Sequence, residues 1–196
     1  MTKAGSGLRL VVVGTSLGGM QALETILHGL MPDFPLPIAV VQHRGADWGV
    51  VSELTRLLQL HSALPLAEAG DKDPIQPGCV YLAPADYHLL VEEDRFALSV
   101  DARVSHARPS IDVLFESAAD AYREGLLAVV LTGASADGAA GARRVRERGG
   151  SVVAQDPATA ESPVMPKAAI ATGAVDHVLP LAEIAAYLNV ASVKHR

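Results

Sequence analysis

Hydrophobic residues in the first third of the chain form two continuous runs separated by helically spaced positions. Residues 8–13 and 38–41 are the runs, and the first contains three consecutive valines. Such runs are typical of parallel strands that are covered on both faces. Apolar residues between and after these runs recur at helical spacing, namely Met20, Leu23, Ile26, Leu27 and Leu30, then Val50, Leu54, Leu57 and Leu58. This β-α-β-α order predicts an α/β sheet.

The middle of the chain has a different pattern. Short apolar segments at 79–82, 88–91 and 96–100 are separated by turn residues. This spacing predicts antiparallel hairpins inserted between two α/β halves.

The second half returns to alternating strands and helices. The pattern predicts helices at 111–122, 137–148, 165–171 and 181–188, and strands at 126–131, 151–154 and 175–178. We therefore expect a three-layer α/β fold: a mostly parallel, doubly wound sheet with a small antiparallel hairpin insertion. We expect one domain over 1–196, with its core at about 8–190.

Composition narrows the class of protein. Hydrophobic residues make up 49% of the chain and charged residues 19%, as in a folded globular domain. A formal net charge of −6 argues against binding nucleic acid. The single cysteine, Cys79, cannot form an internal disulfide and by itself offers no metal site. No apolar run reaches the roughly 20 residues that span a bilayer, so we expect no membrane insertion and a cytoplasmic location.

A serine stands at the end of the first predicted strand. Residues 14–18, Gly-Thr-Ser-Leu-Gly, match the G-x-S-x-G nucleophile elbow, with Ser16 as the nucleophile. The start of the following helix would offer unpaired N–H groups to a developing oxyanion. A phosphate-binding turn is the competing interpretation of the same glycine-rich segment.

Two further strand ends carry the partners that a nucleophilic serine needs. His43 follows the second strand, and Asp137 follows the strand at 126–131. Carboxyl ends of parallel strands meet at one edge of a sheet, where α/β folds bind ligands. Taken alone, His43 could be a loop residue and Asp137 a helix cap. Together with Ser16 they predict a nucleophile, a general base and an orienting carboxylate.

Six ordered segments of the chain carry a family resemblance. They are GTSLGG, VVQHR, YLAPADYH, RPSIDVLFESAA, LTGASADGAAG and VVAQDPATAESPVMPKAAI. Together they resemble the catalytic domain of CheB-type chemotaxis protein-glutamate methylesterases, over residues from about 8 to about 188. The family's α/β fold hydrolyses glutamate methyl esters on the cytoplasmic helices of chemoreceptors, and many members also deamidate receptor glutamines.

The resemblance implies Ser16 as nucleophile, His43 as base and Asp137 as orienting carboxylate, with no metal or organic cofactor. It implies methylated chemoreceptor helices as partners. Backbone N–H groups of Leu17 and Ala134 would bind the oxyanion.

The chain departs from the family pattern at several positions. Family members commonly have Thr at Leu17, Met-Gly at 134–135 and Met at Arg44. Many members also carry a receiver domain ahead of the esterase, whereas only a few residues precede the first strand here. We therefore expect no regulation by phosphorylation within this chain.

Three other functions fit parts of the pattern. A dinucleotide-binding domain would need G-x-G-x-x-G, but the spacing here is G-x-x-x-G-G. An α/β-hydrolase esterase would have the order Ser, Asp, His, but the order here is Ser, His, Asp. A non-catalytic scaffold could keep the same fold.

The remaining histidines and one basic segment have simpler interpretations. We expect His88 and His106 to be structural or surface residues. The arginines at 143, 144, 146 and 148 predict a solvated helix face, with a docking surface for acidic receptor helices as the alternative.

Overall fold

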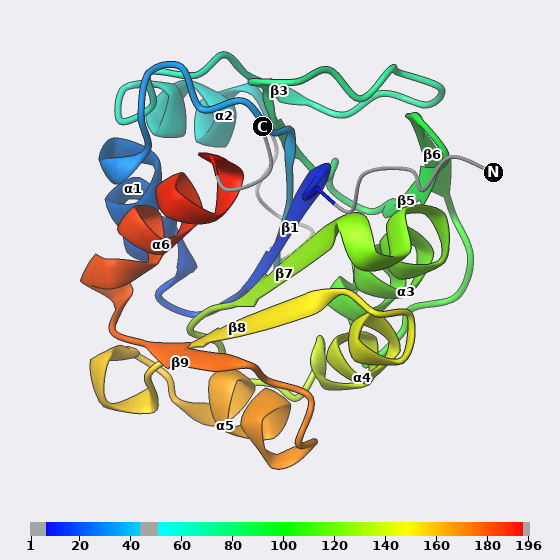
Figure 1. Cartoon of the computed structure of the whole chain (residues 1–196). Coiled ribbons are helices and arrows are strands. Elements are labelled where there is room, and N and C mark those ends of the chain that lie inside the picture. Colours follow the sequence, from blue (N-terminus) through cyan, green and yellow to red (C-terminus); the bar gives the residue numbers. More distant parts are fainter. Residues whose placement is uncertain (1–6, 44–50, 194–196) are drawn as a thin grey trace, which may run out of the picture.

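The computed structural model describes residues 7–43 and 51–193, and its centre is a seven-stranded sheet in which all strands are parallel. The strand order is β3-β4-β2-β1-β7-β8-β9 (Figure 1). The strands are β1 (Leu10–Thr15), β2 (Ile38–Gln42), β3 (Leu66–Glu68), β4 (Val80–Leu82), β7 (Leu126–Val130), β8 (Ser151–Gln155) and β9 (His177–Leu179). The predicted parallel α/β sheet is confirmed.

Helices cover both faces of this sheet. They are α1 (Gly19–Gly29), α2 (Val51–Gln59), α3 (Ile111–Tyr122), α4 (Ala139–Glu147), α5 (Val164–Ala171) and α6 (Leu181–Val193), with short 3₁₀ turns η1 (Arg123–Gly125) and η2 (Pro157–Thr159). Helices α1, α2 and α6 pack on one face, and α3, α4 and α5 pack on the other. Figure 1 shows α1 and α6 on the opposite side of the strands from α3 and α4.

The central strand explains why its sequence is apolar at every position. Side chains of a strand alternate between faces. Leu10 and Val12 belong to the core beneath α3 and α4, while Val11 and Val13 belong to the core beneath α1 and α6. All four side chains are at most 2% exposed. A parallel strand covered on both faces therefore shows no polar alternation.

The predicted insertion is present but smaller than expected. β5 (His88–Glu92) and β6 (Arg95–Ser99) form an antiparallel two-stranded sheet that packs against α3. The expectation that 79–82 also belongs to a hairpin is wrong, because Val80–Leu82 is β4 and pairs in parallel with β2 and β3. A three-residue apolar run has no periodicity that separates these alternatives, so pairing in the folded sheet decides. Strand β3 was not predicted.

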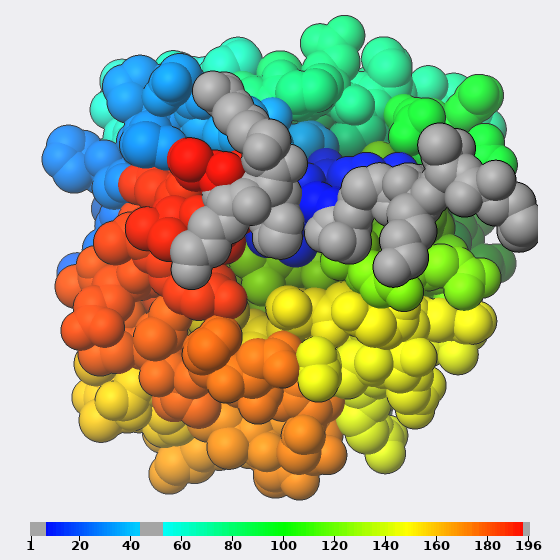
Figure 2. All heavy atoms as spheres, viewed as in Figure 1, coloured from blue at the N-terminus to red at the C-terminus, as the bar shows by residue number. Residues whose placement is uncertain are grey.

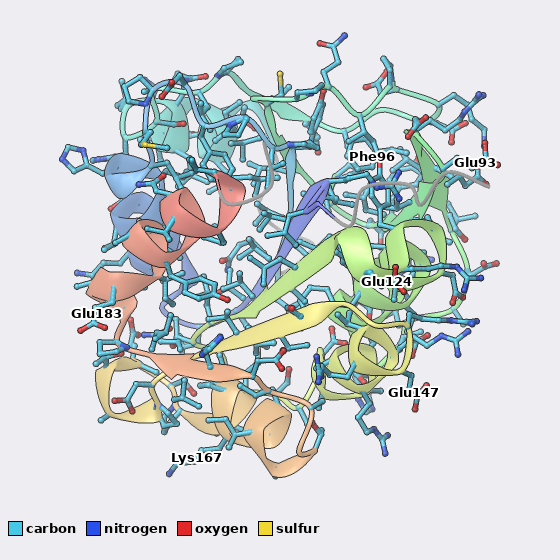
Figure 3. The ribbon with its side chains drawn as sticks, viewed as in Figure 1. Glu93, Phe96, Glu124, Glu147, Lys167 and Glu183 are labelled. Atoms are coloured by element: carbon cyan, nitrogen blue, oxygen red, sulfur yellow. The ribbon has the colours of Figure 1, made fainter. Side chains whose placement is uncertain are left out.

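The outer surface has the polar character expected of such a layered fold. The exposed Glu93, Glu147 and Glu183 side chains lie at the periphery in Figure 3, whereas Phe96 is fully buried. Figure 2 shows the first half of the chain (blue to green) in the upper part of the molecule and the second half largely below it.

Within the described residues, no helix is long and apolar enough to cross a membrane.

Candidate active site

The central strand β1 lies between β2 and β7, and the three predicted site residues follow these neighbouring strands. Ser16 comes directly after β1, His43 comes directly after β2, and Asp137 lies in the loop after β7. The chain leaves β1 for β2 on one side and later returns to pair β7 on the other side. The carboxyl edge beside such a switch in strand order is the usual ligand site of a doubly wound sheet.

Glycines shape the turn that presents Ser16. Gly18 has φ +77°, in the left-handed region that favours glycine, and a Cβ there would also crowd the Glu161 side chain. The Ser16 N–H donates to the carbonyl of Thr132 at 3.0 Å, and Gly19 N–H donates to the carbonyl of Ser16 at 2.9 Å. The second hydrogen bond closes the turn, and the first links Ser16 to the segment that follows β7.

His43 is held directly against Asp137. His43 Nε2 lies 2.7 Å from Asp137 Oδ2. The backbone N–H of His43 donates to the carbonyl of Thr15 at 3.0 Å, which places the histidine next to the residue before Ser16. The Asp137 side chain is fully buried, while the His43 side chain keeps 13% exposure. The imidazole is thus fixed from behind by a buried carboxylate and open to solvent in front.

The carboxylate of Asp137 has four hydrogen-bond partners. Oδ2 accepts from His43 and from the backbone N–H of Ile111 at 2.8 Å. Oδ1 accepts from the Ser110 hydroxyl and from the backbone N–H of Asp112, both at 2.9 Å. Burial alone would raise the pKa of Asp137, but the hydrogen bond from His43 and those from the backbone lower it below its usual value. Asp137 is therefore ionised at neutral pH.

Ser16 and His43 line two adjoining cavities. The larger, of about 620 Å³, is bordered by apolar side chains such as Leu17 and Met20 and by the carboxylates of Glu24 and Glu161. The smaller, of about 300 Å³, is bordered by Ser16, His43, Ser135 and the segment 103–109, which includes Arg103, His106 and Arg108. No hydrogen bond joins the side chains of Ser16 and His43. Both side chains are accessible to a ligand that enters either cavity.

The two backbone N–H groups predicted to bind an oxyanion have no acceptor among the described residues. Neither Leu17 N–H nor Ala134 N–H donates to another described residue. Thr132 Oγ1 donates to the carbonyl of Leu17 at 2.8 Å, and a Cβ built on Gly133 would lie 3.0 Å from Ser16 Cβ. The loop after β7 therefore contacts the turn that carries Ser16 and Leu17.

The other singled-out histidines separate into an interior and a surface residue. His88 is buried: Nε2 lies 3.1 Å from the carbonyl of Ala102, and Nδ1 accepts from Ser110 N–H. His106 is exposed and borders the smaller cavity, so it lies closer to the chemistry than the sequence indicated. Arg44, a departure from the family pattern, lies outside the described residues.

Most of the arginine-rich face of α4 is neutralised. Arg144 and Arg148 pair with Asp120 at 2.9 and 2.7 Å, and Arg146 pairs with Asp176 at 3.1 Å. This pairing favours the solvated-face interpretation over a docking surface.

Sequence reasoning missed two residues that complete the site. Ser110 and Asp112 both contact Asp137, and both lie in the segment RPSID, which contributed to the family resemblance. A short polar residue before an apolar helix was the available signal, but it indicates only a helix cap. What these residues bind became evident only in the folded chain.

Comparison with known proteins agrees with this geometry. A family model described as "CheB methylesterase" matches residues 11–188. The chain belongs to the CheB methylesterase family. The crystal structure of the CheB methylesterase catalytic domain of Thermotoga maritima superposes with a TM-score of 0.89 at 37% identity, covering 94% of this chain and 98% of that one. The α/β fold expected from the resemblance is confirmed.

Relatives of this chain differ in length. A Leptospira interrogans protein is 47% identical over 176 residues, which cover 89% of this chain and 90% of that protein. The Anaeromyxobacter dehalogenans protein-glutamate methylesterase/protein-glutamine glutaminase 2 is 46% identical over 90% of this chain but only 51% of its own length. The match therefore covers nearly all of this chain in both cases.

Proposed function

We propose that this CheB methylesterase hydrolyses glutamate methyl esters on the cytoplasmic helices of chemoreceptors, with Ser16, His43 and Asp137 as its catalytic triad. The observation that carries the proposal is the 2.7 Å hydrogen bond between His43 and buried Asp137, with His43 and Ser16 lining the same two cavities. A histidine oriented by a carboxylate beside an accessible serine is the arrangement that activates a hydroxyl for acyl transfer.

The contact between His43 and Asp137 supports one proton path. In the tautomer in which Nε2–H donates its hydrogen bond to the Asp137 carboxylate, the Nδ1 lone pair is left to act as the base toward Ser16. Nδ1 removes the hydroxyl proton of Ser16 as Oγ attacks the γ-carbonyl carbon of the ester. The tetrahedral intermediate then collapses, and the same proton passes to the departing methoxide, which leaves as methanol. Asp137 stabilises the positive charge that His43 carries between the two transfers.

A water molecule completes the reaction. It gives a proton to His43 and attacks the acyl-Ser16 carbonyl, and the proton returns to Ser16 Oγ as glutamate is released. The N–H groups of Leu17 and Ala134 bind the oxyanion in both halves, since neither has another acceptor in the described chain. Loss of one such donor typically costs about 10²–10³ in kcat.

The same machinery supports deamidation of glutamine. Attack on a side-chain amide yields the same acyl-serine, with ammonia in place of methanol as the leaving molecule. The Anaeromyxobacter dehalogenans relative is named for both activities.

The charge around the smaller cavity suits an acidic protein partner. Asp86 is the carboxylate that pairs with both arginines of this rim, at 2.9 Å for Arg108 and 3.5 Å for Arg103. Arg108 is held further by the carbonyls of Val100 and Asp101, whereas the Arg103 side chain stays 53% exposed. Two arginines therefore share one carboxylate at the smaller cavity, which leaves one positive charge in excess there, although the whole chain carries −6. A glutamate-rich receptor helix in the cytoplasm would meet this excess charge.

Release of methanol from a purified, methylated chemoreceptor cytoplasmic fragment tests the proposal. The wild-type chain should release methanol, and Ser16→Ala should reduce the rate by at least about 10⁴-fold, because it removes the nucleophile. Ser99→Ala, on strand β6, is the matched control and should leave the rate unchanged. Wild-type methanol release by Ser16→Ala would refute the mechanism.

A further inference from the structure

The N-terminus of α4 is bound by a side chain from another helix. Gly138 is the N-cap residue of α4 and has no side chain with which to accept a hydrogen bond. The carboxylate of Asp112, in the first turn of α3, takes this place. Its Oδ1 accepts from Gly138 N–H at 2.8 Å and from Gly141 N–H at 2.7 Å. The first N–H groups of a helix need such an acceptor when they are buried.

The start of α3 is in turn capped by a residue that lies next to α4 in the chain. Its N-cap, Ser110, makes no side-chain cap within α3 and donates to Asp137 instead. Asp137, which precedes α4, accepts the N–H groups of Ile111 and Asp112. The first turn of α4 is therefore capped by Asp112 of α3, and the first turn of α3 is capped by Asp137, which lies just before the N-cap of α4. Figure 1 shows these two helices side by side on one face of the sheet.

We propose that Asp112 is a positioning residue for catalysis: it fixes the start of α4 so that Asp137 stays in line with His43. This inference rests on the proposed function, because it assumes that the contact between His43 and Asp137 serves the reaction.

The connection from Asp112 to His43 passes through short, buried contacts. Asp112 holds Gly138, which directly follows Asp137 in the chain, and Asp137 in turn holds His43 at 2.7 Å. Removing the Asp112 carboxylate would leave two buried N–H groups unsatisfied, and the first turn of α4 would have to move to find water. A displacement of about 1 Å at a catalytic group can cost about 10²-fold in rate.

Asp112 is not placed to contact the substrate. It is buried and borders neither of the cavities that Ser16 and His43 line. Its loss should therefore lower kcat and leave KM nearly unchanged, since KM depends on groups that meet the bound substrate.

The pKa of the Asp112 carboxyl is raised in this position. Burial, together with the neighbouring charge of Asp137, raises its pKa to about 6, although hydrogen bonds from Gly141 and Gly138 oppose the rise. The fold thus retains a second carboxyl next to Asp137 where ionisation is disfavoured. Carboxyls in such surroundings concentrate at functional sites.

Four variants separate positioning from simple helix packing. Asp112→Ala removes the acceptor, and Asp112→Asn keeps an acceptor oxygen in the same place. Asp112→Glu keeps the charge but moves it by one methylene. Asp120→Ala is the matched control, because Asp120 is another α3 aspartate that binds α4, through Arg144 and Arg148 and not at the first turn.

Two rates are measured on each folded chain: the labelling of Ser16 by a fluorophosphonate, and methanol release from the methylated receptor fragment. We expect Asp112→Ala to lower the labelling rate and kcat by about 10- to 100-fold, with KM within about threefold of wild type. Asp112→Asn should restore both rates to within about threefold. Asp112→Glu should lower both by about 5- to 10-fold, and Asp120→Ala should leave both near wild type.

Equal rates for Asp112→Ala and Asp120→Ala, with Ser16→Ala unreactive, would overturn the role of Asp112 and leave the triad standing. If Asp112→Ala does not fold, wild-type rates in Asp112→Glu overturn it in the same way. Undiminished labelling of Ser16→Ala would instead refute the proposed function and the inference with it.

Discussion

At the scale of single residues, Asp137 fits two interpretations that the sequence presented as alternatives. These were the third member of a triad and a helix cap. The structure shows that one oxygen of Asp137 binds His43 and that the carboxylate also caps a helix, although the capped helix is α3 and not its own. Capping and orientation are compatible because a carboxylate has about four acceptor positions.

Asp137→Asn should therefore lower kcat by about 10⁴-fold, the size of effect measured for the equivalent change in a serine protease. An amide cannot stabilise the charged imidazole and can present the wrong partner to Nε2. KM should change little, because Asp137 is fully buried. Steady-state methanol release measures both constants, and a kcat within tenfold of wild type would contradict the assignment.

At the scale of elements, segments that follow three neighbouring strands at one edge of the sheet carry the three predicted catalytic residues. The turn after β1 carries Ser16, the end of β2 carries His43, and the loop after β7 carries Asp137. The segment between β6 and α3 adds the basic rim of the smaller cavity, in which Arg108 is anchored and Arg103 is exposed. The strands position these loops, and the loops determine the chemistry.

Arg103→Glu should raise KM for the methylated receptor fragment by about 2- to 5-fold with kcat nearly unchanged. The reason is that an exposed charge contact contributes about 1 kcal/mol or less, and tenfold in affinity corresponds to about 1.4 kcal/mol. The effect should shrink at high salt.

Arg143→Glu is the control for Arg103→Glu. Arg143 is exposed on α4, the alternative docking face, and does not border the cavities at Ser16. Kinetics at two salt concentrations compare the variants. An increase in KM for Arg143→Glu alone would assign docking to α4 and contradict the basic-rim assignment.

At the scale of the whole molecule, the fold buries the carboxyls of Asp112 and Asp137 next to each other and shifts their pKa values in opposite directions. The fold lowers the pKa of Asp137, so the stability that this residue contributes is present above pH 3.8 and lost as the pH falls through its lowered value. The fold raises the pKa of Asp112 to about 6, so the contribution of that residue is present below pH 3.8 and lost as the pH rises through about 6.

Asp112→Asn should consequently gain stability relative to wild type as the pH rises from 4 to 7.5. The amide does not ionise, whereas the wild-type carboxyl must ionise in a buried site. Urea unfolding at several pH values gives the difference in the free energy of unfolding between the two chains. A difference that stays constant with pH would show that Asp112 does not titrate in this way.

Continuous apolar runs and helical spacing were sufficient to predict β1, β2, β7 and the bounds of α3, because these patterns reflect which faces each element buries. The same reasoning failed for β4. Its three residues are buried in either arrangement, and only pairing with β2 and β3 distinguishes a central parallel strand from a hairpin. The local pattern of apolar residues indicates which residues are buried, but it does not indicate which strand they pair with.

By itself, the sequence determined the fold class, the family resemblance and the three residues at strand ends, since parallel strands must place their carboxyl ends at one edge. Only the tertiary structure decided what surrounds them: the contact between His43 and Asp137, and the caps of α3 and α4 that Asp137 and Asp112 provide. Those contacts join residues 25 to 94 positions apart. Spacing along the chain carries no information about such distances, because they depend on how whole elements pack.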